Sequence, residues 1–582
     1  MKSSAIRRCG VLFCLLWVLW APGAASAGAG AFSAPFVPGQ PTVPVSSLRP
    51  GMKGHLLTVL QGSEPAKLPL EVVSVIPLKG AVGHSVLVRL LAEGMGVAQG
   101  MSGSPVYIQG RLAGAVGAGW NFSDHNMALV TPIEDMCRVF DWPDQPLSLK
   151  RPLLGSFDLA PRSAPLSLSG LDGRALPALE RALGVSVVPS RLTASGELRV
   201  REGGAALSPG DALAVLLAWG DVELASTGTV TATSKDGRFL AFAHPFLSRG
   251  AVNFPAARAW VHATIDSREF PFKLASPMEL VGTVTQDRAA GIGGRLGAFV
   301  PAISAELSFR DSDTGRRSTR RFRVVPDPFL SPKLLTGLYQ GLLDDEWGRR
   351  GQGSFIVTLR VDGRGLENGW ARTNVFFSET DASVAALQEA AQTMEMLLLQ
   401  PFRDVAPAGF RLDVTATEEP RVLYIEDISV PDTVRPGDEL DVEVTLRPWR
   451  RRPVKKSFRL TMPDDATGAC ELLVRGGSVT PLPQLALEGG WKSVQDFKTF
   501  LRELSASDAN NELILELLCD PDALKSPKSD DKRQMAGLLQ EEREFLSETK
   551  SRRIKAGTLQ VSRTEYFVDG FMKRLITIKN ED

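Results

Sequence analysis

Two serines stand among glycines in the stretch GMSGSP, which runs from Gly100 to Pro105 and leads directly into the apolar run VYIQGRLAGAVG. A serine hydroxyl is a weak nucleophile at neutral pH, so acyl chemistry needs a base that takes its proton and donors that stabilise an oxyanion. Glycine ahead of the serines lets the backbone turn so that two amides point at one position. Ser102 is therefore the candidate nucleophile, with the amides of Gly100 and Ser102 as candidate oxyanion donors. Ser104 is then a wall residue, and a Gly/Ser turn without catalytic work is the alternative.

A base for Ser102 has to come from the five histidines of the chain. His244 differs from the others because GRFLAFAHPF carries an apolar strand into His-Pro, which ends the strand with the imidazole at its tip. A packed strand-end histidine is the alternative interpretation. His84 begins a strand-like run shortly before Ser102 and stays in reserve. The remaining histidines lie in strand-like runs or a polar loop and are expected to be structural: His55, His262 and His125.

Three segments taken together resemble the SpoIVB-type serine peptidases, the family of the stage IV sporulation protein B. The segments are GMSGSPVYIQGRLAGAV, GRFLAFAHPFLSRGAV and VGTVTQDRAAGIGGRLG. The resemblance covers residues 45–140 and 205–300. It implies Ser102 as nucleophile, His244 as general base, the amides of Gly100 and Ser102 as the oxyanion hole, and a trypsin-like fold of two barrels.

The chain departs from that family in segment order and in the acid. The histidine segment precedes the serine segment in the family, whereas the serine segment comes first here, so the peptidase unit is permuted. Triads occur in several chain orders, and only the spatial arrangement matters. The family's aspartate lies shortly upstream of the nucleophile motif, where this chain offers only Glu93. Asp287 is the alternative acid and Asp266 a weaker one, and each of the three has the alternative interpretation of a solvated surface carboxylate.

The composition is that of an ordinary globular protein, with 43% hydrophobic residues and 66 basic against 66 acidic side chains. This balance gives no indication of a nucleic-acid partner. A chain of 582 residues is too long for one hydrophobic core. We therefore expect about three to five domains.

The amino-terminal residues predict export. A basic start, an apolar run from Val11 to Trp20 and small residues ending in ASA are typical of a secretory signal over residues 1–27. The apolar run is shorter than the ~20 residues that span a bilayer. We therefore expect a soluble protein after cleavage behind Ala27, and the family resemblance implies the periplasm or cell envelope.

Three cysteines remain after that cleavage: Cys137, Cys470 and Cys519. They allow at most one disulfide and have no metal-binding spacing, so we expect them to be small buried apolar residues. The sequence indicates neither a metal nor a cofactor, and it does not indicate an oligomeric state.

The fold class expected from these patterns is mainly β. Short runs bounded by glycine and proline predict a first barrel unit over residues 45–148 and a second, with His244 and an Asp236-Gly237 hairpin, over 205–330. A linker with a short helix joins them over 149–204. An α+β extension over 331–417 and an immunoglobulin-like sandwich over 418–478 follow, and helix signals, including a capping pair of Ser493 and Asp496, predict a mixed or helical region over 479–582.

Three functional hypotheses fit these features. The first is a serine endopeptidase that cleaves an envelope or secreted protein or peptide. The second is a catalytically inactive, peptidase-like scaffold or binding protein of the cell envelope, with an envelope-protein partner on the carboxy-terminal sandwich. The third is a carbohydrate-binding or adhesive β protein, although the paired carboxylates and aromatic platforms of such sites are not evident. The basic run from Arg450 to Lys456 indicates an edge strand protected from aggregation, with binding of an anionic partner as the alternative.

Overall fold

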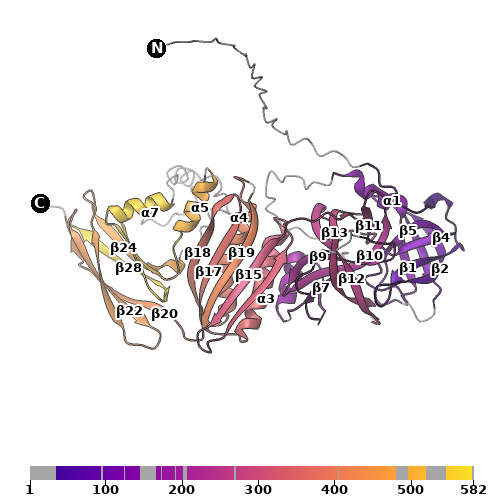
Figure 1. The fold of residues 1–582 in the computed structure, drawn as a ribbon. Coiled ribbons are helices and arrows are strands. Elements are labelled where there is room, and N and C mark those ends of the chain that lie inside the picture. The colour runs from indigo at the N-terminus through magenta and orange to yellow at the C-terminus, as the bar shows by residue number, and fades with distance from the viewer. Residues whose placement is uncertain are drawn as a thin grey trace, which may run out of the picture.

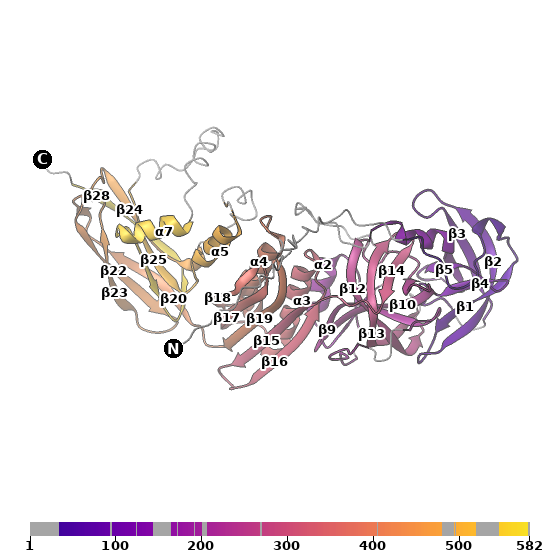
Figure 2. The same ribbon diagram turned by 45° about the horizontal axis from the view of Figure 1, so that its top comes forward.

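The structure is a computed structural model of the whole chain, and it describes residues 34–92, 96–123, 125–143, 165–171, 173–190, 192–200, 206–267, 271–403, 405–479, 494, 496–519 and 546–579. The described chain is mainly β, as expected. Figures 1 and 2 show an elongated molecule with a barrel at one end, a large sheet in the middle and a sandwich at the other end. The expected signal over residues 1–27 lies outside the described residues. In the described part of the chain, no helix is long and apolar enough to cross a membrane.

The first unit is a closed barrel of six antiparallel strands with the order β1-β2-β3-β6-β5-β4. Short strands rich in valine and leucine alternate buried and exposed positions, and their buried side chains fill the barrel. The strands are β1 (Lys53–Val59), β2 (Pro65–Pro77), β3 (His84–Leu90), β4 (Pro105–Ile108), β5 (Arg111–Ala118) and β6 (Met127–Pro132). The 3-10 helix η1 (Val45–Ser47) precedes them, and helix α1 (Ile133–Cys137) and η2 (Arg138–Asp141) follow.

The second unit contains six strands whose pairings return on themselves in the order β9-β10-β11-β14-β13-β12-β9. Counted within its own unit, this is the same strand order as in the first barrel. The Asp236-Gly237 turn joins its second and third strands, which confirms the expected hairpin. The strands are β9 (Ala212–Gly220), β10 (Glu223–Thr233), β11 (Arg238–Ala241), β12 (Gly250–Ile265), β13 (Phe272–Arg288) and β14 (Gly291–Leu296).

The second unit is part of a 13-stranded sheet that extends in both directions. One addition comes from the expected linker: β7 (Leu166–Ser169), the expected short helix α2 (Ala175–Leu183) and β8 (Val187–Pro189). The other comprises β15 (Ile303–Asp311), β16 (Arg317–Val324), α3 (Leu330–Trp347), β17 (Gly353–Arg364), β18 (Leu366–Ser378), α4 (Ala382–Leu399) and β19 (Ala406–Thr417). β15 pairs with β19 of the extension, so this sheet continues across the expected boundary at residue 330.

The carboxy-terminal part is a sandwich of two sheets that enclose one apolar core. The four-stranded sheet contains β20 (Val422–Ser429), β22 (Glu439–Pro448), β23 (Val454–Thr461) and β27 (Phe567–Asp569). The five-stranded sheet contains β21 (Thr433–Val434), β24 (Ala469–Gly476), β25 (Glu512–Leu518), β26 (Leu559–Arg563) and β28 (Phe571–Ile578). β23, which carries Lys455 and Lys456, is an edge strand, as the basic run indicated.

The region over residues 479–582, expected to be mixed or helical, contains both helices and strands in its described part. It contributes α5 (Phe497–Ala506) and α7 (Leu546–Lys555), and it also contributes four strands, β25 to β28, that complete the sandwich. Local sequence patterns do not identify this sheet arrangement, because β27 pairs with β20 and β28 pairs with β24, which lie far away in the sequence. Asp496 is the N-cap of α5, since its carboxylate accepts the amide of Thr499 at 2.7 Å, whereas Ser493 lies outside the described residues.

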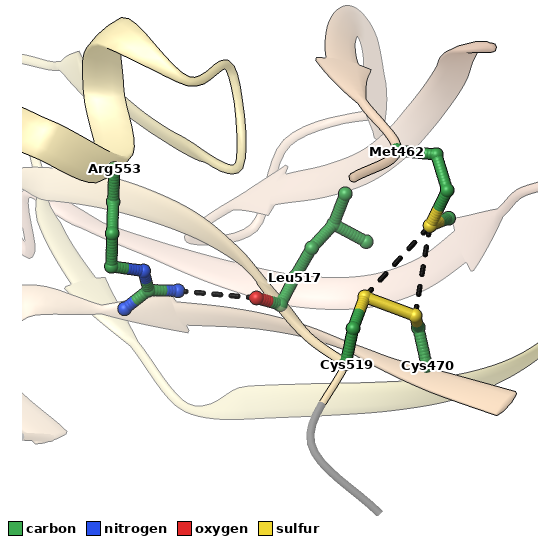
Figure 3. The surroundings of a disulfide bond; sticks show 5 residues. All are labelled: Met462, Cys470, Leu517, Cys519 and Arg553. Carbon is green, nitrogen blue, oxygen red and sulfur yellow. Dashed lines mark hydrogen bonds between the residues drawn. A yellow bond between two sulfur atoms is a disulfide. The ribbon is translucent and has the colours of Figure 1, made fainter. Parts of the chain in front are cut away.

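A disulfide joins Cys470 on β24 to Cys519 just beyond β25, which is the one disulfide that the cysteine count allowed and corrects the expectation that these two are merely small apolar residues. Figure 3 shows the bond beside Met462, whose sulfur lies 3.6 and 3.8 Å from the two bridged sulfurs. Arg553 of α7 donates to the carbonyl of Leu517 at 3.3 Å, which ties the helix to the same strand. Cys137 is free, and burial raises the pKa of its thiol to about 12.

Candidate active site

The candidate nucleophile lies on a sharp turn between β3 and β4 of the first barrel. Two glycines with positive φ, Gly100 at +91° and Gly103 at +89°, surround the half-buried Ser102. A Cβ on Gly103 would lie 2.0 Å from the carbonyl oxygen of Thr229 and 2.4 Å from the amide nitrogen of Phe242. The serine turn, residues 98–104, therefore needs glycine at this position for both conformation and space.

Every carbonyl of the serine turn accepts a hydrogen bond. Four of these carbonyls accept from the second unit, because Thr229 and Thr231 lie on β10 and Lys273 lies on β13. Buried backbone groups are almost always paired, so this accounting fixes the orientation of each peptide plane. The bonds are Met101 N to Ala98 O (2.9 Å), Lys273 N to Gln99 O (3.0 Å), Thr229 Oγ1 to Gly100 O (2.9 Å), Ser104 N to Met101 O (2.9 Å), Thr229 N to Ser102 O (2.8 Å), Thr231 Oγ1 to Gly103 O (2.7 Å) and Val116 N to Ser104 O (3.0 Å).

The amides of the same turn divide into two groups. Five of them donate: Ala98 to the sulfur of Met101, Gln99 to Pro271 O, Met101 to Ala98 O, Gly103 to Val116 O and Ser104 to Met101 O. Within the described residues, the amides of Gly100 and Ser102 have no acceptor. These are the two donors that the sequence predicted for an oxyanion hole. Two free amides separated by one residue, on a turn whose other backbone groups are all bonded, are candidate donors to a negative oxygen.

His244 lies in the turn between β11 and β12, which is the same connection of the second unit that holds Ser102 in the first. The two residues before it, Phe242 and Ala243, have φ values of +67° and +55°. Residues other than glycine rarely adopt this backbone conformation, and such strain persists only where the surrounding structure enforces it. The hydroxyl of Thr131 on β6 donates to Ala243 O at 2.7 Å and so helps to hold this conformation. The same bond connects the histidine turn to the first barrel.

The imidazole of His244 is held in one tautomer. Its Nδ1 lies 2.7 Å from the carbonyl oxygen of Pro245, and because a carbonyl only accepts, Nδ1 carries the proton and Nε2 keeps its lone pair. Burial lowers the pKa of His244, and the bond to Pro245 opposes this shift. The neutral imidazole that a general base requires is therefore favoured at neutral pH.

The serine and histidine turns touch, since Gly103 packs against the backbone of Phe242. In the part of the chain that the structure describes, no hydrogen bond joins the hydroxyl of Ser102 to His244. Catalytic hydrogen bonds are often long in unliganded proteins and shorten when substrate binds. The structure thus brings the two turns into contact, but it does not join Ser102 and His244 by a hydrogen bond.

Asp287 is buried at the end of β13, with 1% of its surface exposed, so it is not a solvated surface carboxylate. Its oxygens accept the amides of Phe246 at 2.7 Å, Leu247 at 2.8 Å and Arg249 at 3.0 Å. Burial raises the pKa of Asp287, and the three amides oppose this shift. The carboxylate fixes the backbone directly after His244 and does not bond to the imidazole.

The other candidates contribute less. Glu93 lies outside the described residues, and Asp266 is exposed just beyond β12. His84 opens β3, His55 stacks on Tyr107 with ring centroids 5.2 Å apart, His262 contacts Ser276 at 3.1 Å, and His125 follows Ser123 in a turn.

Sequence reasoning missed Lys273, which is 7% exposed and lies beneath the serine turn. Its Nζ lies 2.8 Å from Thr58 Oγ1 on β1 and 3.3 Å from Thr229 Oγ1 on β10. Burial lowers the pKa of Lys273 to about 7. Its position inside the apolar run FPFKLASPM is the signal that could have identified it, because a lone lysine among such residues is buried at a cost.

A cavity of about 360 Å³ lies away from this site, on the face of β9, β15, β16, β17 and β19. Charged side chains line it, and several pair with one another, including Arg321 with Glu306 at 2.8 Å and Arg323 with Glu197 at 2.6 Å. We assign it no chemistry.

No family model, no curated protein and no solved structure matches this chain. Among the described residues, no cluster of His, Cys, Asp and Glu could hold a metal ion. Function is therefore inferred from the geometry of the two turns.

Proposed function

We propose that the chain is an exported serine endopeptidase of the SpoIVB type, with Ser102 as nucleophile and His244 as base. The observation that carries the proposal is the pair of free amides at Gly100 and Ser102 on a turn whose other backbone groups are all bonded. Two units of equal strand order, with the serine and the histidine in equivalent connections, agree with the trypsin-like two-barrel fold that the resemblance implies.

The proposed reaction is acyl transfer. Nε2 of His244 takes the proton of the Ser102 hydroxyl as its oxygen attacks the carbonyl of the substrate peptide, and the oxyanion binds the two free amides. The peptide C–N bond then breaks, the amine leaves with the proton from His244, and an acyl-serine remains. A water molecule, deprotonated by His244, hydrolyses that ester and restores both residues. Asp287 holds the turn that carries His244, in the supporting role of the third residue.

Substrate and compartment follow from the same family resemblance. The signal predicted over residues 1–27 places the chain outside the cytoplasm, so the substrate is an exported or envelope protein presented as an extended segment. We further propose that the carboxy-terminal sandwich, of the immunoglobulin-like type, contacts an envelope protein.

The test is covalent labelling of the full-length mature protein with a fluorophosphonate, mapped by mass spectrometry. We expect modification of Ser102 in the wild type, and none in Ser102→Ala or His244→Ala. Ser123→Ala is the matched control, because Ser123 is an exposed serine of the same barrel. Modification at other residues only, or modification that survives both substitutions, would contradict the proposal.

An inactive scaffold is the second candidate. The observation that favours it is that Nδ1 of His244 bonds to Pro245 O and not to a carboxylate, since the acid of a triad stabilises the charged imidazole. A folded wild type that fluorophosphonate does not modify would support this candidate.

A further inference from the structure

We propose that Lys273 is a positioning residue for the oxyanion site: from beneath the serine turn it holds the peptide groups whose amides receive the substrate oxygen. The inference rests on the proposed function and adds to it a residue outside the serine, histidine and acid set. It is carried by four contacts that join Lys273 to the first barrel, to the second unit and to the turn itself.

The backbone of Lys273 fixes one of the two free amides directly. In a planar trans peptide the carbonyl and the amide of the same group point in opposite directions. The group that carries the amide of Gly100 has Gln99 O as its carbonyl, and Lys273 N donates to that oxygen at 3.0 Å. The Gly100 amide therefore points away from the Lys273 amide of β13.

The stem of Lys273 explains why residue 100 has no side chain. A Cβ on Gly100 would lie 3.1 Å from Cδ and 3.2 Å from Cβ of Lys273, which is closer than ordinary contact. Packing of an apolar stem under a glycine leaves the turn little room to move.

The ammonium group completes the support through Thr229. Nζ lies 3.3 Å from Thr229 Oγ1, which uses its single proton to donate to Gly100 O at 2.9 Å. Thr229 also accepts from the Ser104 hydroxyl at 3.4 Å, and its backbone amide donates to Ser102 O at 2.8 Å. Thr229 thus bonds to two carbonyls of the turn. The ammonium group of Lys273 bonds to Thr229 and also to Thr58, which connects Thr229 to β1.

The environment of Nζ makes this support depend on pH. The groups that bond to it are hydroxyls, Thr58 from β1 and Thr229 from β10, and neither titrates near neutral pH. No ion pair joins Lys273 to a carboxylate in the residues that the structure describes. With a pKa of about 7, the amine is charged below neutrality and neutral above it. The positive charge polarises Thr229 and favours an oxyanion above the turn, so its loss weakens the site. His244 also titrates in the site. Its deprotonation as the pH rises favours labelling, whereas deprotonation of Lys273 slows labelling.

The decisive experiment compares the rate constant of fluorophosphonate labelling at Ser102 in Lys273→Met and the wild type across pH 5–9. Methionine keeps the backbone amide and the stem and removes only the ammonium group. We expect labelling to slow ~10-fold to 100-fold, since small misplacements of a catalytic group cost that much. We also expect the decline of the wild-type rate above pH ~7 to disappear. Lys67→Met, at an exposed lysine of β2, is the matched control and should label like the wild type.

Thr229→Val provides a second test, should Lys273→Met not fold. Valine keeps the side-chain volume and the hydrogen bond from the backbone amide of residue 229 to Ser102 O, and it removes the hydroxyl. Labelling should therefore again slow at least ~10-fold. Wild-type rates in both variants would overturn the role of Lys273 and leave the peptidase proposal intact. Slower labelling with an unchanged pH profile and a matching loss of thermal stability would make Lys273 merely structural. A wild type that is never labelled would overturn both proposals.

Discussion

At the scale of single residues, the candidate site depends on groups whose protonation is set by burial. His244 is kept neutral, Asp287 accepts three amides, and Lys273 bonds only to hydroxyls through its amine. Perturbed titratable groups that gather around two touching turns are typical of functional sites, although structural networks also perturb pKa values.

The first prediction concerns the acid side of the pH profile. Burial lowers the pKa of His244, so the imidazole stays neutral to lower pH than a free histidine. The labelling rate at Ser102 should therefore rise with pH through a midpoint below the ordinary histidine value of about 6.5. His84→Ala should leave this limb unchanged. A midpoint at or above 6.5 would argue against the buried His244 as the base.

The second prediction is a pH dependence of stability due to Lys273. Its pKa falls from the ordinary lysine value of 10.5 to about 7 in the folded protein. Between these values the unfolded chain binds a proton that the folded chain does not, so the unfolding free energy rises with pH across this window. Denaturant titrations of the wild type should show the unfolding free energy rising with pH from pH 7 to 10. In Lys273→Met this slope should be smaller by the contribution of one bound proton. Equal slopes in the two proteins would mean that Lys273 is not buried as described.

At the scale of elements, each half of the site is a tight turn between the third and fourth strand of a six-stranded unit. The two turns differ in how they obtain their conformation. The serine turn uses glycine where φ is positive, whereas the histidine turn forces Phe242 and Ala243 into that region. Strain of this kind costs of order 1–3 kcal/mol per residue and is expected where function fixes the geometry.

The third prediction tests the serine turn. Gly103→Ala should destabilise the protein by several kcal/mol and abolish labelling, because the added methyl meets backbone atoms at 2.0 and 2.4 Å. The loss of stability should exceed the ~1–3 kcal/mol typical of overpacking, because backbone atoms have to move to make room for the methyl group. Gly110→Ala is the matched control, since Gly110 also has positive φ, at +75°, but has open space around it. Thermal denaturation and labelling measure both effects, and similar losses in the two variants would show that conformation alone matters.

At the scale of the whole molecule, the first barrel and the carboxy-terminal sandwich lie at opposite ends of the elongated molecule (Figure 1). The sandwich has its own core, formed by residues from 423 to 578, and its own disulfide. The 13-stranded sheet connects the two ends. Separate cores of this kind suggest that stability and site chemistry can be altered independently.

The fourth prediction follows from this separation. The Cys470–Cys519 disulfide closes a span of 49 residues, so the double substitution Cys470→Ser and Cys519→Ser should destabilise the sandwich by about 2–4 kcal/mol. Labelling at Ser102 should keep its wild-type rate, since the disulfide belongs to the sandwich, which has a core of its own. Calorimetry that resolves the transitions, combined with labelling, checks both statements. A parallel loss of labelling would show that the parts are coupled.

Local patterns in the sequence determine the turn chemistry of this protein. Glycines around Ser102, the His-Pro that ends an apolar strand, the Asp236-Gly237 hairpin and the Asp496 cap all act through the few residues beside them. Such signals predicted a mainly β chain and two candidate turns, because backbone conformation at glycine, proline and capping residues is decided locally.

Tertiary structure alone decided which distant strands meet. Lys273 reaches Thr58 across 215 positions, and four strands beyond residue 479 complete a sandwich that begins near residue 420. Strand pairing is selected by burial and register between segments far apart in the chain, which no short window of sequence contains. For the same reason the sequence could nominate the amides of Gly100 and Ser102, but only the folded chain could bond every other backbone group of the turn and leave those two amides free.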